Sequence, residues 1–214
     1  MKNRRIPIFL TIFFIVLAAC FLYFATNVID EFEKKKPALP ILGNDHNHHV
    51  QPFSFINQDG ITITEKTTKG KICIVEYFFA TCKGICPKMN ENMRIIYNEY
   101  KGNKDVLILS HTVDPQKDSV IALKAYSNKF KADAQHWMFL TGDKKQLYEA
   151  ARFSYLINAQ QDTAGLTIDK DFIHDKHFVL VDRLGRIRGF YDGLEESSMN
   201  TLIVDIKTLL KEKE

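Results

Sequence analysis

The stretch Lys71–Met93, KICIVEYFFATCKGICPKMNENM, combines three features that decide the fold. Its first ten residues, Lys71–Ala80, form a nearly continuous apolar run rich in β-branched and aromatic side chains, which predicts a buried central strand. Two cysteines follow directly, Cys82 and Cys86, and Pro87 comes next. Proline suits the first turn of a helix, where its missing N–H costs nothing. Helical spacing then continues through Met89, Met93, Ile96 and Tyr100. The cysteine pair is therefore expected at a strand-to-helix turn, where open α/β sheets usually build their sites.

The rest of the apolar pattern extends this unit into a mixed α/β domain. Alternating residues around Asp59-Gly60 predict a β-hairpin within residues 53–64. Further strands are expected at 105–114, 136–142, 177–182 and 187–193, and further helices at 115–130, 143–156 and 195–213, with a long polar loop over 157–173. Asp143 is the expected cap of its helix. This order predicts a mixed sheet with helices on both faces, as in a thioredoxin-like fold with an extra N-terminal β-hairpin.

The composition is that of an ordinary globular protein and excludes some functions. The 214 residues include 29 basic and 26 acidic side chains, for a net charge of +3. This balance is too even to predict a nucleic-acid partner. The sequence also shows no internal repeat and no glycine-rich phosphate-binding loop.

The N-terminus predicts a membrane anchor. A basic start is followed by Ile6–Val28, 23 residues without a charge, which is long enough to span a bilayer as a helix. The basic residues Lys2, Arg4 and Arg5 are expected to stay on the cytoplasmic side. The sequence therefore predicts a single-pass protein of the cytoplasmic membrane, whose soluble domain lies on the extracytoplasmic (periplasmic) side.

A lipid anchor is the alternative, because Leu17–Cys20, LAAC, resembles a bacterial lipobox in which Cys20 would be lipidated after cleavage. Both alternatives give the same domain organisation. Residues 1–29 are the expected anchor (signal anchor or lipoprotein signal), residues 30–51 a flexible His-containing tether without apolar periodicity, and residues 52–214 the folded domain.

The cysteines of the domain fall into two groups. Cys73 lies inside the apolar strand and is expected to be a small buried hydrophobe. Cys82 and Cys86 lie on a turn at a helix start, where the helix dipole stabilises a thiolate. Three functions compete for this pair: a redox dithiol, a peroxide-reducing cysteine and a metal site. A structural disulfide between Cys82 and Cys86 would add little stability, because closing so small a loop hardly constrains the unfolded chain.

Spacing and context help to weigh these functions. Thioredoxin-type reductases generally use Cys-x-x-Cys together with a later cis proline, whereas the last proline here is Pro115. The Pro-x-x-x-Thr-x-x-Cys pattern of peroxiredoxins is absent before either cysteine. Two soft sulfur ligands favour Cu(I) or Zn(II), and a third ligand would have to come from elsewhere in the chain.

The sequence resembles the Sco (SenC/PrrC) copper proteins of cytochrome c oxidase assembly. The resemblance covers about residues 52–210 and rests on three motifs: YFFATCKGICPKMNENM, HTVDPQKDS and FIHDKHFVLVDRLGRIRGFYDG. In that family a Cys-x-x-x-Cys-Pro pair is joined by a histidine eleven residues before the glycine of a hairpin turn. That glycine is Gly185 here, so the resemblance implies His174 as the third ligand. The chain departs from the family at Asp175, where serine or threonine is common, and this leaves partner specificity open.

The other histidines are less strong candidates. His177 falls where the family has strand residues and is expected not to be a ligand. His111 follows a buried strand and could support the site from behind, whereas His136 is expected to be an ordinary surface or core residue. The tether histidines, His46, His48 and His49, form either a solvated linker or an auxiliary copper-capture patch.

The resemblance implies a membrane-tethered copper metallochaperone. It would bind one copper ion, Cu(I) or Cu(II), through Cys82, Cys86 and His174. It would deliver that ion to the binuclear copper site of cytochrome c oxidase, or prepare the cysteines of that site. The implied partners are the copper-bearing oxidase subunit, a copper donor protein and a thiol reductant protein. The alternative is a tethered thiol–disulfide oxidoreductase that uses Cys82 and Cys86 without metal, so enzymatic activity stays open. A copper or redox sensor would share the same site.

Overall fold

The computed structural model describes residues 5–34, 38–43, 47–157 and 175–212. The chain divides into two compact units, Met1–Ala38 and Leu39–Glu214. The first contains the helix α1, Arg5–Lys34, which continues past the apolar run into Asp30, Glu31 and Glu33. Among the described residues, no helix combines the length and apolar character that crossing a membrane requires. The membrane span predicted at Ile6–Val28 is thus not supported by the structure.

The second unit is built around β3, Ile72–Phe78, the strand predicted from the apolar run. All seven of its residues are buried. It pairs in parallel with β4, Val106–Thr112, and antiparallel with β6, His177–Val181. The whole sheet has seven strands in the order β2-β1-β5-β4-β3-β6-β7. The prediction of a central strand and a mixed sheet is confirmed.

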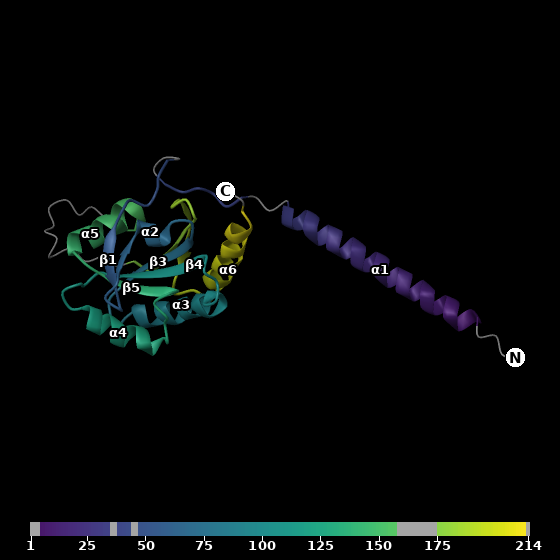
Figure 1. The fold of residues 1–214 in the computed structure, drawn as a ribbon, viewed down its shortest axis with the longest axis horizontal. Coiled ribbons are helices and arrows are strands. Elements are labelled where there is room, and N and C mark those ends of the chain that lie inside the picture. Colours follow the sequence, from purple (N-terminus) through teal and green to yellow (C-terminus); the bar gives the residue numbers. More distant parts are fainter. Residues whose placement is uncertain (1–4, 35–37, 44–46, 158–174, 213–214) are drawn as a thin grey trace. The chain divides into compact units, whose positions relative to one another are not determined.

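The remaining elements largely follow the predicted order (Figure 1). The other strands are β1 (Ser54–Asn57), β2 (Thr62–Thr64), β5 (Trp137–Thr141) and β7 (Ile187–Asp192). The helices are α2 (Glu65–Thr68), α3 (Cys86–Tyr100), α4 (Val120–Lys129), α5 (Lys144–Glu149), the π-helical turn η1 (Ala150–Ser154) and α6 (Glu196–Lys211). The short α2 was not predicted, since four residues carry no helical period. Asp143 caps α5, as expected, by accepting a hydrogen bond from the backbone N–H of Gln146.

The predicted N-terminal hairpin is present and extends the sheet. β1 and β2 pair antiparallel around a turn in which Gly60 has a φ of +77°, a conformation that glycine adopts without strain. β1 also pairs antiparallel with β5, with Ile56 opposite Thr141. The hairpin therefore covers what would otherwise be the exposed edge of β5.

Two apolar clusters cover the two faces of the sheet, because successive residues of a buried strand point to opposite sides. One cluster joins β3 residues such as Ile72, Ile74 and Phe78 to side chains of α3, α4 and α6. The other joins Cys73, Val75 and Tyr77 to side chains of α5 and η1. Helices on both faces were predicted. Cys73 is 4% exposed, as expected of a small hydrophobe.

The helix expected from Pro115 begins five residues later, at Val120, with the hydroxyl of Ser119 as its cap. The preceding residues form a turn in which the N–H groups of Lys117 and Asp118 both donate to the carbonyl of Asp114. Asp118 is 1% exposed and its carboxylate is engaged with neighbouring loops. This buried contact explains why the helix starts late.

Part of the segment expected to be a flexible tether is ordered on the domain. The compact unit begins at Leu39, well before the expected boundary near Pro52. The N–H of Leu42 donates to the carbonyl of Ile187 at 2.8 Å, and the N–H of Val50 donates to the carbonyl of Gly185 at 2.9 Å. Leu39, Leu42 and Val50 also pack against the apolar clusters. We call the described residues of 39–51 the strap. The strap stays on the domain because it forms hydrogen bonds with backbone groups of edge strand β7 and its turn, and because its apolar side chains pack against the core.

Candidate metal centre

The cysteine pair lies between the C-terminal end of β3 and the first turn of α3. The chain turns sharply after the strand, and the N–H of Cys82 donates to the carbonyl of Phe79 at 3.1 Å. Cys86 is the first residue of α3, and Pro87 follows within its first turn, as predicted. Cys82 is half-buried, whereas Cys86 is only 5% exposed. Both are free thiols in this structure.

Cys82 is the more acidic of the two thiols. Its partial burial favours the neutral form, but hydrogen bonds outweigh that effect and hold its pKa below the ordinary value. The donors are the thiol of Cys86 and the backbone N–H groups of Cys86, Gly84 and Ile85. Donors that converge on one sulfur at a helix start stabilise a thiolate.

Cys86 has the opposite character. Burial, followed by its hydrogen bond to Cys82, raises its pKa to about 12. The negative charges of Cys82 and of Glu76 contribute to this rise, while a backbone hydrogen bond involving Phe79 opposes it. The pair therefore combines an accessible, more acidic thiol with a buried thiol that keeps its proton at neutral pH.

The structure describes two of the three predicted metal ligands. His174 lies outside the described residues. Within the part of the chain that the structure covers, no group of three or more His, Cys, Asp or Glu side chains is arranged to hold a metal ion. Two thiolates alone could still supply the soft ligands that Cu(I) prefers.

Three other predicted histidines can be placed. His177 begins β6, and its Nδ1 lies 2.9 Å from a carboxylate oxygen of Asp175. His48 belongs to the strap, and its Nε2 lies 3.0 Å from the carbonyl oxygen of Ser154. His49 is engaged with the carbonyl of Asn47. His48 is thus held against the domain rather than solvated in a linker, and His46 lies outside the described residues.

His111 faces away from the cysteine pair. It is fully buried in β4, and its ring stacks on Tyr77 with centroids 5.0 Å apart. Its aromatic neighbours Phe55, Tyr77 and Tyr155 belong to one apolar cluster, whereas Cys86 belongs to the cluster on the other face of the sheet. Burial lowers its pKa to about 3, so the imidazole is neutral. The hypothesis that His111 supports the cysteine site is therefore wrong, because strand alternation directs its side chain to the face of the sheet opposite Cys86.

Asp118 fixes the loop that carries Cys82. One oxygen of its carboxylate accepts hydrogen bonds from the N–H of Ala80, at 3.0 Å, and from the hydroxyl of Thr112. Ala80 lies two residues before Cys82, so this buried carboxylate links the cysteine loop to the end of β4. Asp118 falls within the motif HTVDPQKDS, but the motif alone does not reveal this contact.

A second buried carboxylate, Glu76, was missed. It lies in β3 and is fully buried, with Oε1 accepting a hydrogen bond from Ser110 and Oε2 without a hydrogen-bond partner among the described residues. The hydroxyl of Ser110 in turn accepts from Nε1 of Trp137 at 2.8 Å. Burial raises the pKa of Glu76 to about 7, although the Ser110 hydrogen bond opposes this. A single charged residue inside the apolar run was the signal that could have revealed it.

These features define a class of protein: a thioredoxin-like domain with a reduced dithiol at the exposed end of its central strand. The SCO1/SenC family model matches residues 43–211. The "SCO1 protein homolog" of Bacillus subtilis is 30% identical over 164 residues, which are 76% of this chain and 83% of the relative. The chain belongs to the SCO1/SenC family.

Solved structures agree with this assignment. BsSco, described as having a disulfide switch and as a member of the Sco family of cytochrome c oxidase assembly proteins, superposes with a TM-score of 0.65 at 28% identity. The match covers 81% of this chain and all of BsSco. A SCO1/SenC family lipoprotein from Bacillus anthracis has a TM-score of 0.65 at 29% identity, over 79% of this chain and 99% of its own. ScoI of Arabidopsis thaliana, solved with copper bound, has a TM-score of 0.56 at 26% identity, over 73% of this chain and 97% of its own.

Proposed function

We propose that this protein is a copper metallochaperone that binds one copper ion through Cys82, Cys86 and His174. It delivers the ion to the binuclear copper site of cytochrome c oxidase, or prepares the cysteines of that site. The observation that carries the proposal is the pair of free thiols at the start of α3, one accessible and one buried. Membership of a family with a copper-bound relative supports copper as the cargo.

The unequal thiols suggest an order of binding. Cys82 is the more acidic and more accessible of the two thiols, so it makes the first bond to an incoming Cu(I) ion. Cys86, whose pKa is raised, must release its proton to make the second bond, so copper loading is coupled to proton release. His174, three residues before β6 in the sequence, supplies the third bond. Transfer to a recipient by ligand exchange needs an accessible ligand, and Cys82 meets that need.

Anaerobic titration of the reduced full chain with Cu(I) tests the proposal. Wild type is expected to bind one equivalent, while Cys82→Ala and Cys86→Ala lose stoichiometric binding. His174→Ala is expected to bind much more weakly, because only two ligands remain. His177→Ala is the matched control, three residues away, and should bind as wild type does. Tight binding of one copper ion by the double cysteine variant would contradict the proposal.

We also propose that residues 1–29 attach the domain to the extracytoplasmic side of the membrane. The description of the Bacillus anthracis relative as a lipoprotein supports the lipid alternative at Cys20. Intact mass measurement of the membrane-extracted protein distinguishes the two modes of attachment. A lipidated chain begins at Cys20 with added acyl mass, and Cys20→Ala abolishes that product. An unprocessed chain of full mass would leave the N-terminal helix as the anchor.

A second candidate function, thiol–disulfide exchange, is favoured by the same asymmetry and by the disulfide switch described for BsSco. The Cys82 thiolate would attack a substrate disulfide and release one substrate thiolate. Cys86 would then lose its proton and attack the mixed disulfide, leaving a Cys82–Cys86 disulfide and a fully reduced substrate. A reductant protein must restore the dithiol. In this function His174→Ala spares the activity, whereas in the copper function it weakens metal binding.

A further inference from the structure

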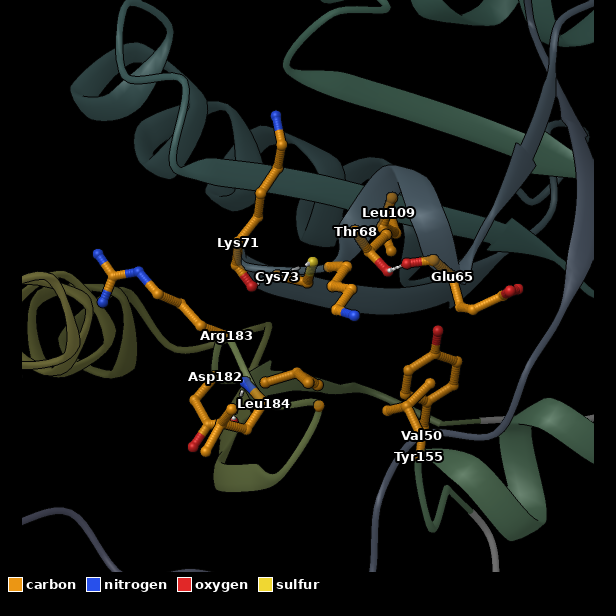
Figure 2. Close-up of a pocket in the computed structure, with 13 residues that line it drawn as sticks. Val50, Glu65, Thr68, Lys71, Cys73, Leu109, Tyr155, Asp182, Arg183 and Leu184 are labelled. Atoms are coloured by element: carbon orange, nitrogen blue, oxygen red, sulfur yellow. Dashed lines mark hydrogen bonds between the residues drawn. The ribbon is translucent and has the colours of Figure 1, made fainter. Parts of the chain in front are cut away.

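A cavity of about 270 Å³ lies at the end of the sheet opposite the cysteine pair. Its wall includes Cys73, the second residue of β3, whereas Cys82 follows the last residue of that strand. Seven strand residues span roughly 20 Å, so the two sites are separate. Figure 2 shows the cavity between α2, the strap and the turn that joins β6 to β7.

The cavity has mostly apolar walls. They are formed by Val50 of the strap, Leu109 of β4, Val181 of β6 and Leu184 of the β6–β7 turn, together with the sulfur of Cys73. For comparison, an engineered apolar cavity of about 150 Å³ is large enough to bind benzene. The present volume therefore accommodates a single substituted aromatic ring.

One polar group within this wall lacks a partner. Tyr155 is 1% exposed, and its hydroxyl points into the cavity (Figure 2). It makes no hydrogen bond with another described residue. The two other buried tyrosines of the same apolar cluster both donate to backbone carbonyls, Tyr77 to Leu147 at 3.0 Å and Tyr148 to Val113 at 2.9 Å. Because a buried tyrosine hydroxyl ordinarily has a partner, Tyr155 is arranged to donate to an occupant of the cavity.

The charges around the cavity favour an anion. Three cationic residues line it, Lys69, Lys71 and Arg183, against the two acidic residues Glu65 and Asp182. Asp182 is neutralised by ion pairs with Arg186 and Arg188, at 2.8 and 3.0 Å. Arg183 is likewise paired, with Asp105 at 3.9 Å, whereas Lys71 donates a hydrogen bond to the neutral backbone carbonyl of Lys104. Lys69 is exposed and forms no ion pair in the described part of the chain. With Asp182 and Arg183 both paired, Lys69 and Lys71 outnumber Glu65, so the net charge around the cavity is positive.

We propose that this cavity is a binding site for a small aromatic monocarboxylate. The ring lies against the apolar walls, and the carboxylate accepts a hydrogen bond from the Tyr155 hydroxyl near the basic residues. A neutral ligand of the same shape would be attracted less strongly by the positive charge around the cavity. A dianion would lose more hydration free energy on entering a largely apolar space. The site is independent of the copper proposal.

Methyl NMR of the full chain in phospholipid nanodiscs tests this site, with benzoate as the probe. Saturable shifts are expected for the methyl groups of Leu109, Val181 and Leu184, with a dissociation constant on the order of millimolar for so small a ligand. Leu123, in the other apolar cluster, reports non-specific effects and should not shift. Benzamide, the neutral analogue, is expected to bind several-fold more weakly.

Two variants tie the binding to the cavity. Tyr155→Phe removes only the hydroxyl and should weaken benzoate binding about tenfold, the effect of one charge-assisted hydrogen bond. Tyr77→Phe is the matched control, because its hydroxyl already donates to Leu147, and should leave binding unchanged. Cys73→Met fills the cavity and should abolish binding without lowering the melting temperature.

The opposite results would overturn the proposal. Absence of saturable shifts in the wild type would mean that the cavity holds only water. Shifts that persist unchanged in both Tyr155→Phe and Cys73→Met would place the benzoate elsewhere. Equal binding of benzoate and benzamide would show that the cavity does not recognise the carboxylate, which would overturn the proposal of a monocarboxylate ligand.

Discussion

At the scale of single residues, the two thiols of CKGIC differ in pKa although they lie only four positions apart. Cys82 collects hydrogen bonds that stabilise its thiolate, whereas Cys86 is buried and keeps its proton. Cys73 is buried as well, and burial raises its pKa to about 12. The three cysteines have the same side chain, so their different reactivities come from the burial and hydrogen bonding around each sulfur.

This difference predicts the order of alkylation. In the reduced, metal-free protein at pH 7, iodoacetamide is expected to modify Cys82 first, with Cys86 and Cys73 reacting far more slowly. The rate at Cys82 should level off below pH 9, because its pKa is lowered. Peptide mass spectrometry at timed intervals measures all three rates. Faster modification of Cys86 would show that the assignment of thiolate and thiol is reversed.

Glu76 predicts a pH dependence of stability. Its pKa of about 7 in the folded state lies above the ordinary value of 4.5, so between these values the folded state binds the extra proton. The free energy of unfolding should therefore fall as pH rises from about 4.5 to 7, by a total on the order of 3 kcal/mol, and should not change further from this cause above pH 7.

Urea unfolding from pH 4.5 to 8 measures this dependence. Glu76→Gln keeps the shape and the uncharged state, so it should be more stable than wild type at pH 8 and should lose this part of the pH dependence. Glu91→Gln, at an exposed ion pair of α3, is the control and should behave as wild type does. A Glu76→Gln profile parallel to that of wild type would show that the carboxylate does not titrate in this range.

At the scale of elements, Asp118 joins three segments: the loop after β3, the end of β4 and the turn before α4. It does so because a single buried oxygen accepts from both Ala80 and Thr112. The position of the cysteine loop thus depends on a residue more than thirty positions away. The same contact delays the start of α4 to Val120.

Replacing this carboxylate should loosen the cysteine loop. Asp118→Ala is expected to destabilise the domain by about 1–3 kcal/mol, because the N–H of Ala80 and the hydroxyl of Thr112 lose their buried partner. Hydrogen exchange at the amide of Ala80 should accelerate in parallel. Asp105→Ala, at a largely exposed side chain, should change neither quantity. Unchanged exchange at Ala80 in Asp118→Ala would show that the loop is held by other contacts.

At the scale of the whole domain, Arg188 connects both ends of the compact unit. It is 4% exposed and donates to the carbonyls of Leu39 and Pro40 in the strap, and to the carboxylates of Asp182 and Glu212. Glu212 follows the end of α6, so one side chain of β7 links the strap, the β6–β7 turn and the C-terminal helix. The strap is therefore part of the folded domain.

Loss of this link should release the strap. Arg188→Ala leaves buried carbonyls and carboxylates unpaired and is expected to cost about 3–5 kcal/mol of stability, measured by urea unfolding. Hydrogen exchange at the amides of Leu42 and Val50 should rise more than at the core strand β3. Arg186→Ala, which removes a more exposed partner of the same Asp182, should cost less and leave these amides protected. Equal effects of the two variants would rule out a special role for Arg188.

Much of the fold could be predicted because its signals are local. The apolar run of β3, the Asp59-Gly60 turn and the Asp143 cap each depend on neighbouring residues, and all three are confirmed. Predictions that depended on distant contacts were less successful. The helix from Pro115 began late because of Asp118, and the strap was mistaken for a linker because its apolar residues are too sparse to form a period.

The sequence by itself determined the order of the elements and the position of the cysteine pair at the end of a central strand, since side-chain periodicity and turn chemistry are properties of short segments. It also singled out Cys82 and Cys86 as candidate ligands through their motif, and its resemblance to the Sco family implied His174 as the third. Only the tertiary structure decided which thiol keeps its proton, that His111 faces away from the pair, and that the strap folds onto β7. These depend on burial and on hydrogen bonds between residues far apart in the chain, which folding brings together and sequence spacing does not reveal.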